Sequence, residues 1–170
     1  MRILGIDPGF ERLGVAILEK NKGDQKSASA QSYDTTKEKV LFSECFHTSP
    51  KIDFPERLLS IGKEVKNIIK KYKPEVLAIE TLFLTTNQKT VMHVAEVRGV
   101  IIYEASLAGL KIFEASPPQI KIAITGYGKA NKDQVMRMVK ILVDIDKNKK
   151  SDDELDAIAI ALTAFAHIRN

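Results

Sequence analysis

The sequence predicts an α/β protein in which one mixed five-stranded sheet carries helices on both faces. Three short apolar segments joined by turns come first, and sequential strands of this kind usually pair antiparallel. Segments with helical periodicity then alternate with further apolar runs, and strand–helix–strand connections favour parallel pairing with a right-handed crossover. The C-terminal segment is apolar almost all round, as expected for a helix packed against a sheet. The length of 170 residues fits a single domain, residues 1–170.

Five strands are expected from short apolar runs that end in turn residues. They cover residues 2–7, 13–18, 40–47, 75–80 and 111–113. Pro8 and Gly9 close the first strand in a turn. Residues 20–39 are polar and predict a long connection between the second and third strands.

Five helices are expected from apolar residues at three- and four-residue spacing and from capping signals. They cover residues 55–72, 87–107, 116–126, 131–142 and 151–168. Asn131 with Gln134, and Ser151 with Glu154, have the spacing of capping boxes at the starts of the last two helices.

The composition excludes several classes of protein. Cys45 is the only cysteine, which excludes an internal disulfide and a cysteine-rich zinc site. The longest apolar stretch, residues 157–166, is interrupted by Thr163 and is too short to span a bilayer. The first residues, MRILGID, do not resemble a signal peptide because an acid and turn residues follow at once. We therefore expect a cytoplasmic protein.

The positive charge is concentrated in one part of the chain. The net charge is +4, whereas residues 111–150 alone hold nine lysines or arginines against four acids. The rest of the chain holds several acids in apolar surroundings. A basic surface close to such acids indicates that the partner is an acidic polymer and that a metal ion acts at the reaction site. The simpler alternative is a solvated lysine-rich surface.

Four acids stand in unusual positions. Asp7 and Glu80 each end an otherwise apolar strand, and Asp156 lies within the apolar C-terminal run, three residues after Asp153. Ligands of α/β sheets bind beyond the carboxyl ends of the strands, so we expect the four carboxylates to converge there. The spacing leaves open whether Asp152 or Asp153 is the partner of Asp156.

Converging carboxylates repel one another, and a cation would relieve that repulsion. Oxygen ligands without histidine or cysteine favour Mg²⁺ or Mn²⁺ over Zn²⁺. Two such ions can stabilise the attacking and leaving oxygens of a phosphodiester displacement. The alternative is that each acid is simply solvated, and the helix dipole favours acids in the first turn of a helix anyway.

Two further features allow other interpretations. Asp7, Pro8 and Gly9 with Gly14 also fit the opening of sugar-kinase and actin-like ATPases, but 170 residues leave no room for their second lobe. Phe83 follows Glu80 closely and could stack on a base or wedge into DNA, although before any family resemblance a core aromatic that covers the helix end is the simpler interpretation. The three histidines lack ligand spacing.

Five segments, in this order, resemble RuvC-type Holliday junction resolvases over nearly the whole chain. They are GIDPG (residues 5–9) with Gly14, IETLF (79–83) with Asn87, EVRGV (96–100), PPQIKIAITGYGKANKDQV (117–135) and DELDAIAIA (153–161). The resemblance implies an RNase H-like fold and a Mg²⁺-dependent endonuclease that resolves four-way DNA junctions in recombination and repair. It implies paired symmetric nicks by a homodimer, with 5′-phosphate and 3′-hydroxyl ends.

The resemblance also assigns roles to residues and partners. It makes Asp7, Glu80, Asp153 and Asp156 the catalytic, metal-binding carboxylates, for two Mg²⁺ that Mn²⁺ can replace, and thus selects Asp153 over Asp152. The residues that it matches to DNA-binding positions are Phe83, Asn87, Lys121 and Lys132, and the two lysines also support catalysis. It implies the RuvA–RuvB branch-migration complex as a partner in the bacterial cytoplasm.

Two other functions stay open at this point. A related RNase H-like nuclease would cut structured RNA, and a non-catalytic module would bind junctions without nicking them. The intact set of acids argues against the second.

Overall fold

A computed structural model describes residues 1–20, 38–82, 88–143, 145 and 150–168. Its strands form one five-stranded sheet in the order β3-β2-β1-β4-β5. The strands are β1 (Arg2–Asp7), β2 (Arg12–Glu19), β3 (Lys39–His47), β4 (Val76–Glu80) and β5 (Lys111–Ala115). β1 pairs antiparallel with β2 and parallel with β4, β2 pairs antiparallel with β3, and β4 pairs parallel with β5. The predicted mixed sheet is therefore confirmed.

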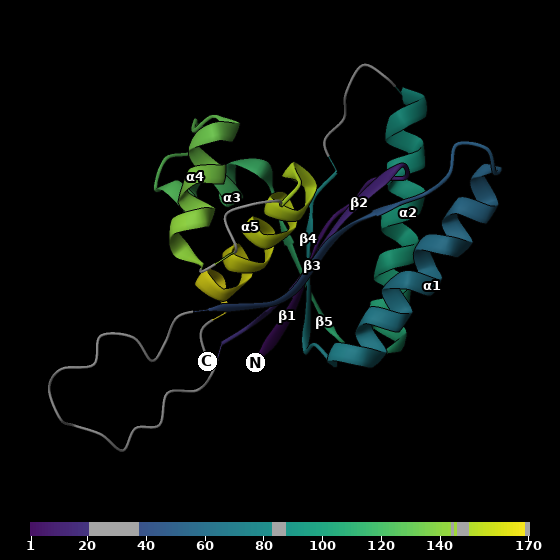
Figure 1. The fold of residues 1–170 in the computed structure, drawn as a ribbon, viewed down its shortest axis with the longest axis horizontal. Helices are drawn as coiled ribbons and strands as arrows, with labels where there is room; N and C mark the ends of the chain where they lie inside the picture. Colours follow the sequence, from purple (N-terminus) through teal and green to yellow (C-terminus); the bar gives the residue numbers. More distant parts are fainter. Residues whose placement is uncertain (21–37, 83–87, 144, 146–149, 169–170) are drawn as a thin grey trace, which may run out of the picture.

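The helices cover both faces of this sheet, as predicted (Figure 1). They are α1 (Phe54–Tyr72), α2 (Gln88–Leu107), α3 (Pro117–Thr125), α4 (Lys132–Leu142) and α5 (Asp152–His167). α1 and α2 enclose one apolar core against the sheet, and α3, α4 and α5 enclose a second one on the other face. α5 lies directly on β1 and β2, and α3 and α4 pack against α5.

Local signals explain most of the boundaries. Asp53 caps α1 by accepting a hydrogen bond from the Glu56 amide (3.0 Å), and both expected capping boxes are present at α4 and α5. The predicted end of β5 at residue 113 is wrong. Glu114 and Ala115 continue the strand because they pair with Ile79 and Glu80 of β4.

Two glycines let α5 approach the sheet closely. A Cβ atom at Gly5 would lie 2.2 Å from the Ala157 carbonyl oxygen, and one at Gly14 would lie 2.1 Å from that of Asp153. No side chain larger than hydrogen fits at such distances. The sequence of β1 and β2 therefore decides how near the first two turns of α5 come to the end of β1.

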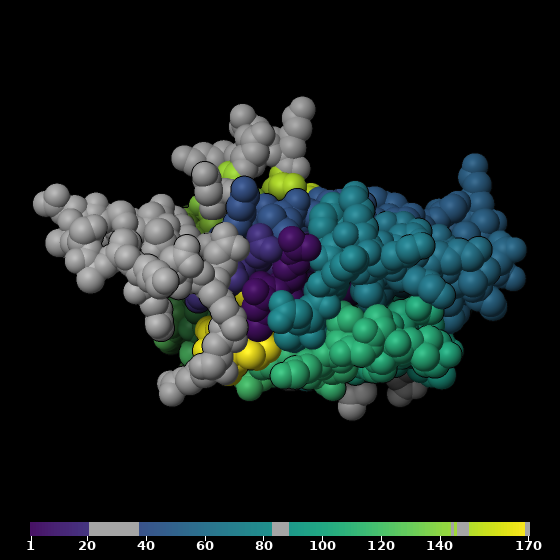
Figure 2. Space-filling view, turned by 90° about the horizontal axis from the view of Figure 1, so that it is seen from below, coloured from purple at the N-terminus to yellow at the C-terminus, as the bar shows by residue number. Residues whose placement is uncertain are grey.

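The opposite end of the sheet carries the N-terminus. The Lys20 amide donates to the Met1 carbonyl (3.0 Å), and the Glu75 amide donates to the Arg2 carbonyl (2.9 Å). Figure 2 shows the purple start of β1 beside the teal residues that lead into β4. Most of the expected 20–39 connection lies outside the described residues. None of the helices in the described ranges is long and apolar enough to cross a membrane.

Candidate active site

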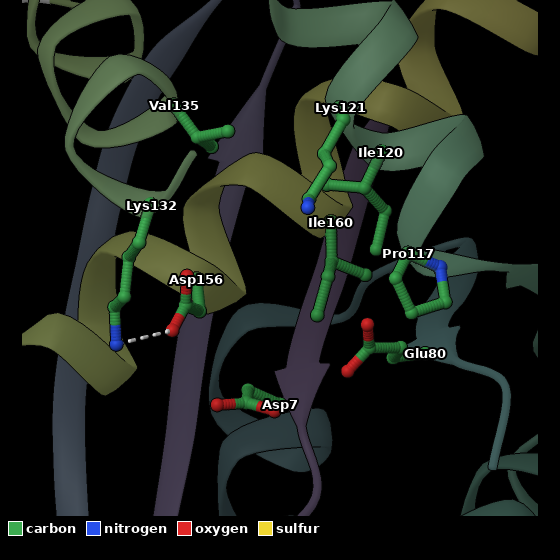
Figure 3. A pocket seen from close by; sticks show the side chains of 9 residues that line it. All are labelled: Asp7, Glu80, Pro117, Ile120, Lys121, Lys132, Val135, Asp156 and Ile160. Atoms are coloured by element: carbon green, nitrogen blue, oxygen red, sulfur yellow. Dashed lines mark ion pairs between the residues drawn. The ribbon is translucent and has the colours of Figure 1, made fainter. Parts of the chain in front are cut away.

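A cavity of about 240 Å³ opens at the carboxyl ends of β1 and β4. Acidic, basic and apolar side chains line it together (Figure 3). The lining residues are Asp7, Glu80, Pro117, Ile120, Lys121, Lys132, Val135, Asp156 and Ile160. Three acids and two lysines therefore share one space, although they come from β1, β4, α3, α4 and α5.

The parallel pairing of β1 with β4 brings the first two acids together. Ile6 stands opposite Ile79 in this pair, so the next residues, Asp7 and Glu80, leave the sheet at the same end. Asp156 reaches them from α5, which the close packing on Gly5 and Gly14 holds near β1. The structure thus places three of the four expected carboxylates at one cavity (Figure 3).

Asp153 differs from the expectation of four converging acids, because it does not line the cavity. The guanidinium group of Arg12, at the start of β2, forms an ion pair with its carboxylate. The thiol of Cys45 also contacts the same carboxylate oxygen, at 3.4 Å. An exposed arginine of the protein's own chain thus pairs with Asp153 beside the cavity.

The two lysines lie on the side of the cavity formed by α3 and α4. Lys132 Nζ is 3.4 Å from Asp156 Oδ2 and 3.2 Å from Asp152 Oδ2. Lys121 extends from α3 toward the same space (Figure 3). Asp152, which the spacing alone could not separate from Asp153, pairs with Lys132 and does not line the cavity.

Comparison with known proteins identifies the family. The model of the family "Crossover junction endodeoxyribonuclease RuvC" matches residues 3–164. The chain belongs to the RuvC family. It is 40% identical to the RuvC of Caldanaerobacter subterraneus subsp. tengcongensis over 95% of this chain and 90% of that protein. It is also 40% identical to the RuvC of Petrotoga mobilis, over 98% of this chain and 93% of that protein.

A solved RuvC structure confirms the RNase H-like fold. Thermus thermophilus RuvC in complex with a Holliday junction substrate has a TM-score of 0.84 and 30% sequence identity, over 98% of this chain and 94% of that one. RuvC membership makes the chain a crossover junction endodeoxyribonuclease and implies a dependence on divalent metal ions.

The electrostatics of this RuvC cavity favour a cation. Burial, followed by repulsion from Asp156 and Glu80, raises the pKa of Asp7 from 3.8 to about 7. Burial and then Asp156 raise the pKa of Glu80. Burial also raises the pKa of Asp156, although Lys132 acts in the opposite direction. Three negative charges in this cavity are therefore unfavourable without positive charge beside them.

The donor set fits a hard divalent ion. All three acidic donors are carboxylates, which suit Mg²⁺ and Mn²⁺. Within the described ranges, no three His, Cys, Asp or Glu side chains form a ready-made metal cage. Mg²⁺ does not need such a cage, because it usually binds through one or two carboxylates, several waters and substrate phosphates.

Two of the predicted DNA-binding residues, Phe83 and Asn87, lie outside the described residues, so their role stays a prediction.

Two arginines beside the acids, Arg12 and Arg98, were not predicted from the sequence. Arg98, on α2, donates a hydrogen bond to the backbone carbonyl of Glu80 (3.0 Å). In the sequence, the only sign of this contact is that Arg98 stands between two apolar residues of a helix, Val97 and Ile101. The structure buries the side chains of Val97 and Ile101.

Proposed function

We propose that this RuvC-family chain resolves four-way DNA junctions by hydrolysing one phosphodiester bond in each of two strands. The observation that carries the proposal is the cavity itself, where three carboxylates face two lysines at the ends of parallel strands. The products would carry 5′-phosphate and 3′-hydroxyl ends, which a ligase can join. The solved structure of the T. thermophilus relative with a Holliday junction substrate supports the choice of substrate.

The acids would hold the metal. When bound by Asp7, Glu80 and Asp156, two Mg²⁺, or Mn²⁺ in their place, would supply an activated water and would stabilise the leaving 3′ oxygen. Asp153 would join this set only after it separates from Arg12, which now pairs with it. The four acids therefore divide into three that already face the cavity and one that needs to move.

The lysines would act on the phosphate. Lys121 and Lys132 line the same cavity as the acids, so their amines can position the scissile phosphate and stabilise the charge that develops on it. Without DNA, Lys132 instead neutralises part of the charge of Asp156 and Asp152. In this scheme, Phe83 contacts a DNA base and Asn87 also binds the DNA.

A homodimer would present two such cavities to two strands of like polarity. Large apolar side chains lie exposed along one side of α2, where Met92, Tyr103 and Leu107 are each more than 60% exposed. Their spacing of eleven and four residues puts them on one helix face. A two-fold dimer through that face would match the symmetry of a four-way junction. The dimer would act in the bacterial cytoplasm, together with the RuvA–RuvB complex.

A strand-mapped cleavage assay on a mobile four-way junction tests the proposal. Single-stranded DNA, duplex DNA and structured RNA serve as the other substrates. We expect paired nicks in the junction only, and we expect Asp7→Asn protein to bind the junction without cutting it. Cleavage of structured RNA instead, tight binding without nicks in Mg²⁺ or Mn²⁺, or cutting by the Asp7→Asn protein would each contradict the proposal.

A further inference from the structure

Arg98 connects three elements next to the cavity. It extends from α2, and its Nε atom donates a hydrogen bond to the carbonyl oxygen of Glu80, the last residue of β4 (3.0 Å). The same guanidinium group forms an ion pair with Glu114 on β5. Its side chain is only 17% exposed, so a full positive charge has been placed largely inside the protein at this point.

The backbone around Glu80 is held from two sides. On the β5 side, the amide of Thr81 donates to the Ala115 carbonyl (2.9 Å). On the α2 side, Arg98 holds the carbonyl of Glu80. The direction of a side chain depends on the backbone that carries it, and Glu80 is the last residue of its strand. These two contacts therefore hold the backbone from which the Glu80 carboxylate extends.

We propose that Arg98 is a positioning residue, which holds the Glu80 carboxylate in the direction of the metal site. Through Arg98, the position of this carboxylate would depend on the position of α2. The inference rests on the proposed role of Glu80. A guanidinium group suits this task because it is planar and offers five donors in a fixed fork, so that one side chain can serve a carbonyl and a carboxylate together. A lysine amine, a point charge on a flexible stem, cannot hold both in the same geometry.

A merely structural role would give a different result from a positioning role. If Arg98 only joins α2 to the sheet, its loss lowers the stability of the fold, and the folded fraction still binds metal and cuts DNA normally. If Arg98 positions Glu80, the folded protein binds metal less tightly and turns over more slowly. A displacement of about 1 Å in a reacting group can cost about 100-fold in rate.

The experiment compares Arg98→Lys, Arg98→Met and Glu114→Ala with the parent chain. Lys66→Met serves as the matched control, because Lys66 is an exposed cation on α1. The measurements are Mn²⁺ binding to the DNA-free protein by electron paramagnetic resonance, kcat and KM on a four-way junction, and thermal unfolding without metal.

We expect Arg98→Met to lower kcat about 10- to 100-fold and to weaken Mn²⁺ binding, with KM changed less than twofold. Arg98→Lys should resemble Arg98→Met. Glu114→Ala should fall between them and the parent, because it leaves the bond to the Glu80 carbonyl in place. Lys66→Met should behave as the parent does.

The proposal would be overturned if folded Arg98→Lys and Glu114→Ala proteins had the kcat and the Mn²⁺ affinity of the parent, whatever their melting temperatures. These two variants also decide the question if Arg98→Met does not fold. Failure of the proposed function is a separate outcome, because the parent chain itself would then not cut the junction. The Mn²⁺ comparison would still test Arg98 in that case.

Discussion

Replacing Asp7 by Asn should stabilise the metal-free protein at high pH while it removes the nuclease activity. Burial and the neighbouring acids raise the pKa of Asp7 from 3.8 to about 7. The folded state therefore binds a proton at Asp7 more tightly than the unfolded chain does. Since the stability of a protein falls with pH wherever the folded state binds more protons, stability is lost as the pH rises from about 4 to about 7.

The size of this loss follows from the shift. One pKa unit corresponds to 1.36 kcal/mol, so moving from pH 5 to pH 8 costs the metal-free folded state about 2–3 kcal/mol at Asp7 alone. For a chain of this length, that is a fall of roughly 5–10 °C in melting temperature. The raised pKa values of Glu80 and Asp156 act with the same sign.

The assay is urea unfolding at pH 5 and pH 8 in the presence of EDTA. The advantage of Asp7→Asn over the parent should be about 2–3 kcal/mol larger at pH 8 than at pH 5. Glu56→Gln, which removes an exposed acid of α1, should change stability about equally at both pH values. Saturating Mg²⁺ should flatten the slope of the parent, because a bound cation favours the ionised carboxylates.

Two results would refute this reasoning. One is a parent protein whose metal-free stability stays constant or rises between pH 5 and pH 8. The other is an Asp7→Asn protein with the same pH slope as the parent. Either would mean that burial and the neighbouring acids do not raise the pKa of Asp7 in the folded chain, and the electrostatic argument for a cation at this cavity would then fail.

Three further substitutions probe the site and its support. Gly14→Ala should destabilise the fold by about 3 kcal/mol, the upper end for overpacking, because its Cβ would lie 2.1 Å from the Asp153 carbonyl oxygen; parent-like urea unfolding would disprove this. Lys132→Met should lower the single-turnover rate on a junction by about 100- to 1000-fold, and an unchanged rate would exclude Lys132 from the chemistry. Arg12→Ala should leave thermal unfolding nearly unchanged, because exposed ion pairs contribute little. It should also strengthen Mn²⁺ binding by releasing Asp153, and weaker binding would show that Arg12 helps to hold the metal-binding form.

The parts of the fold and site that depend on local pattern could be predicted. Apolar runs, turn residues and capping boxes identified every strand and helix of the described residues, within a few residues at their ends. The meeting of Asp7 and Glu80 followed from one inference, that the strands they end are parallel neighbours, because the register of a parallel pair then fixes both positions. Asp156 followed from its place in an apolar helix.

The parts that depend on contacts between distant side chains could not be predicted. The position of Asp153 depends on Arg12, which lies 141 residues away in the sequence. The carbonyl of Glu80 is held by Arg98 from another element. Spacing along a helix shows which face a carboxylate occupies, but it does not show which cation from another strand will be within reach.

The packing of α5 on the sheet brings Asp156 of α5 close to Asp7 of β1. The proposed metal site needs this close approach, but the same approach destabilises the metal-free protein. α5 contributes most of its residues to the apolar core, and Gly5 and Gly14 bring it close to β1 and β2. This close approach removes water from around Asp7 and Asp156, and burial is the largest cause of their raised pKa values. Looser packing would therefore relieve the repulsion in the metal-free protein, but it would also move Asp156 away from Asp7. A divalent cation bound by these acids would remove this conflict, because it would stabilise the ionised acids at the distance that the packing requires. Metal binding and folding should therefore be strongly coupled in this chain.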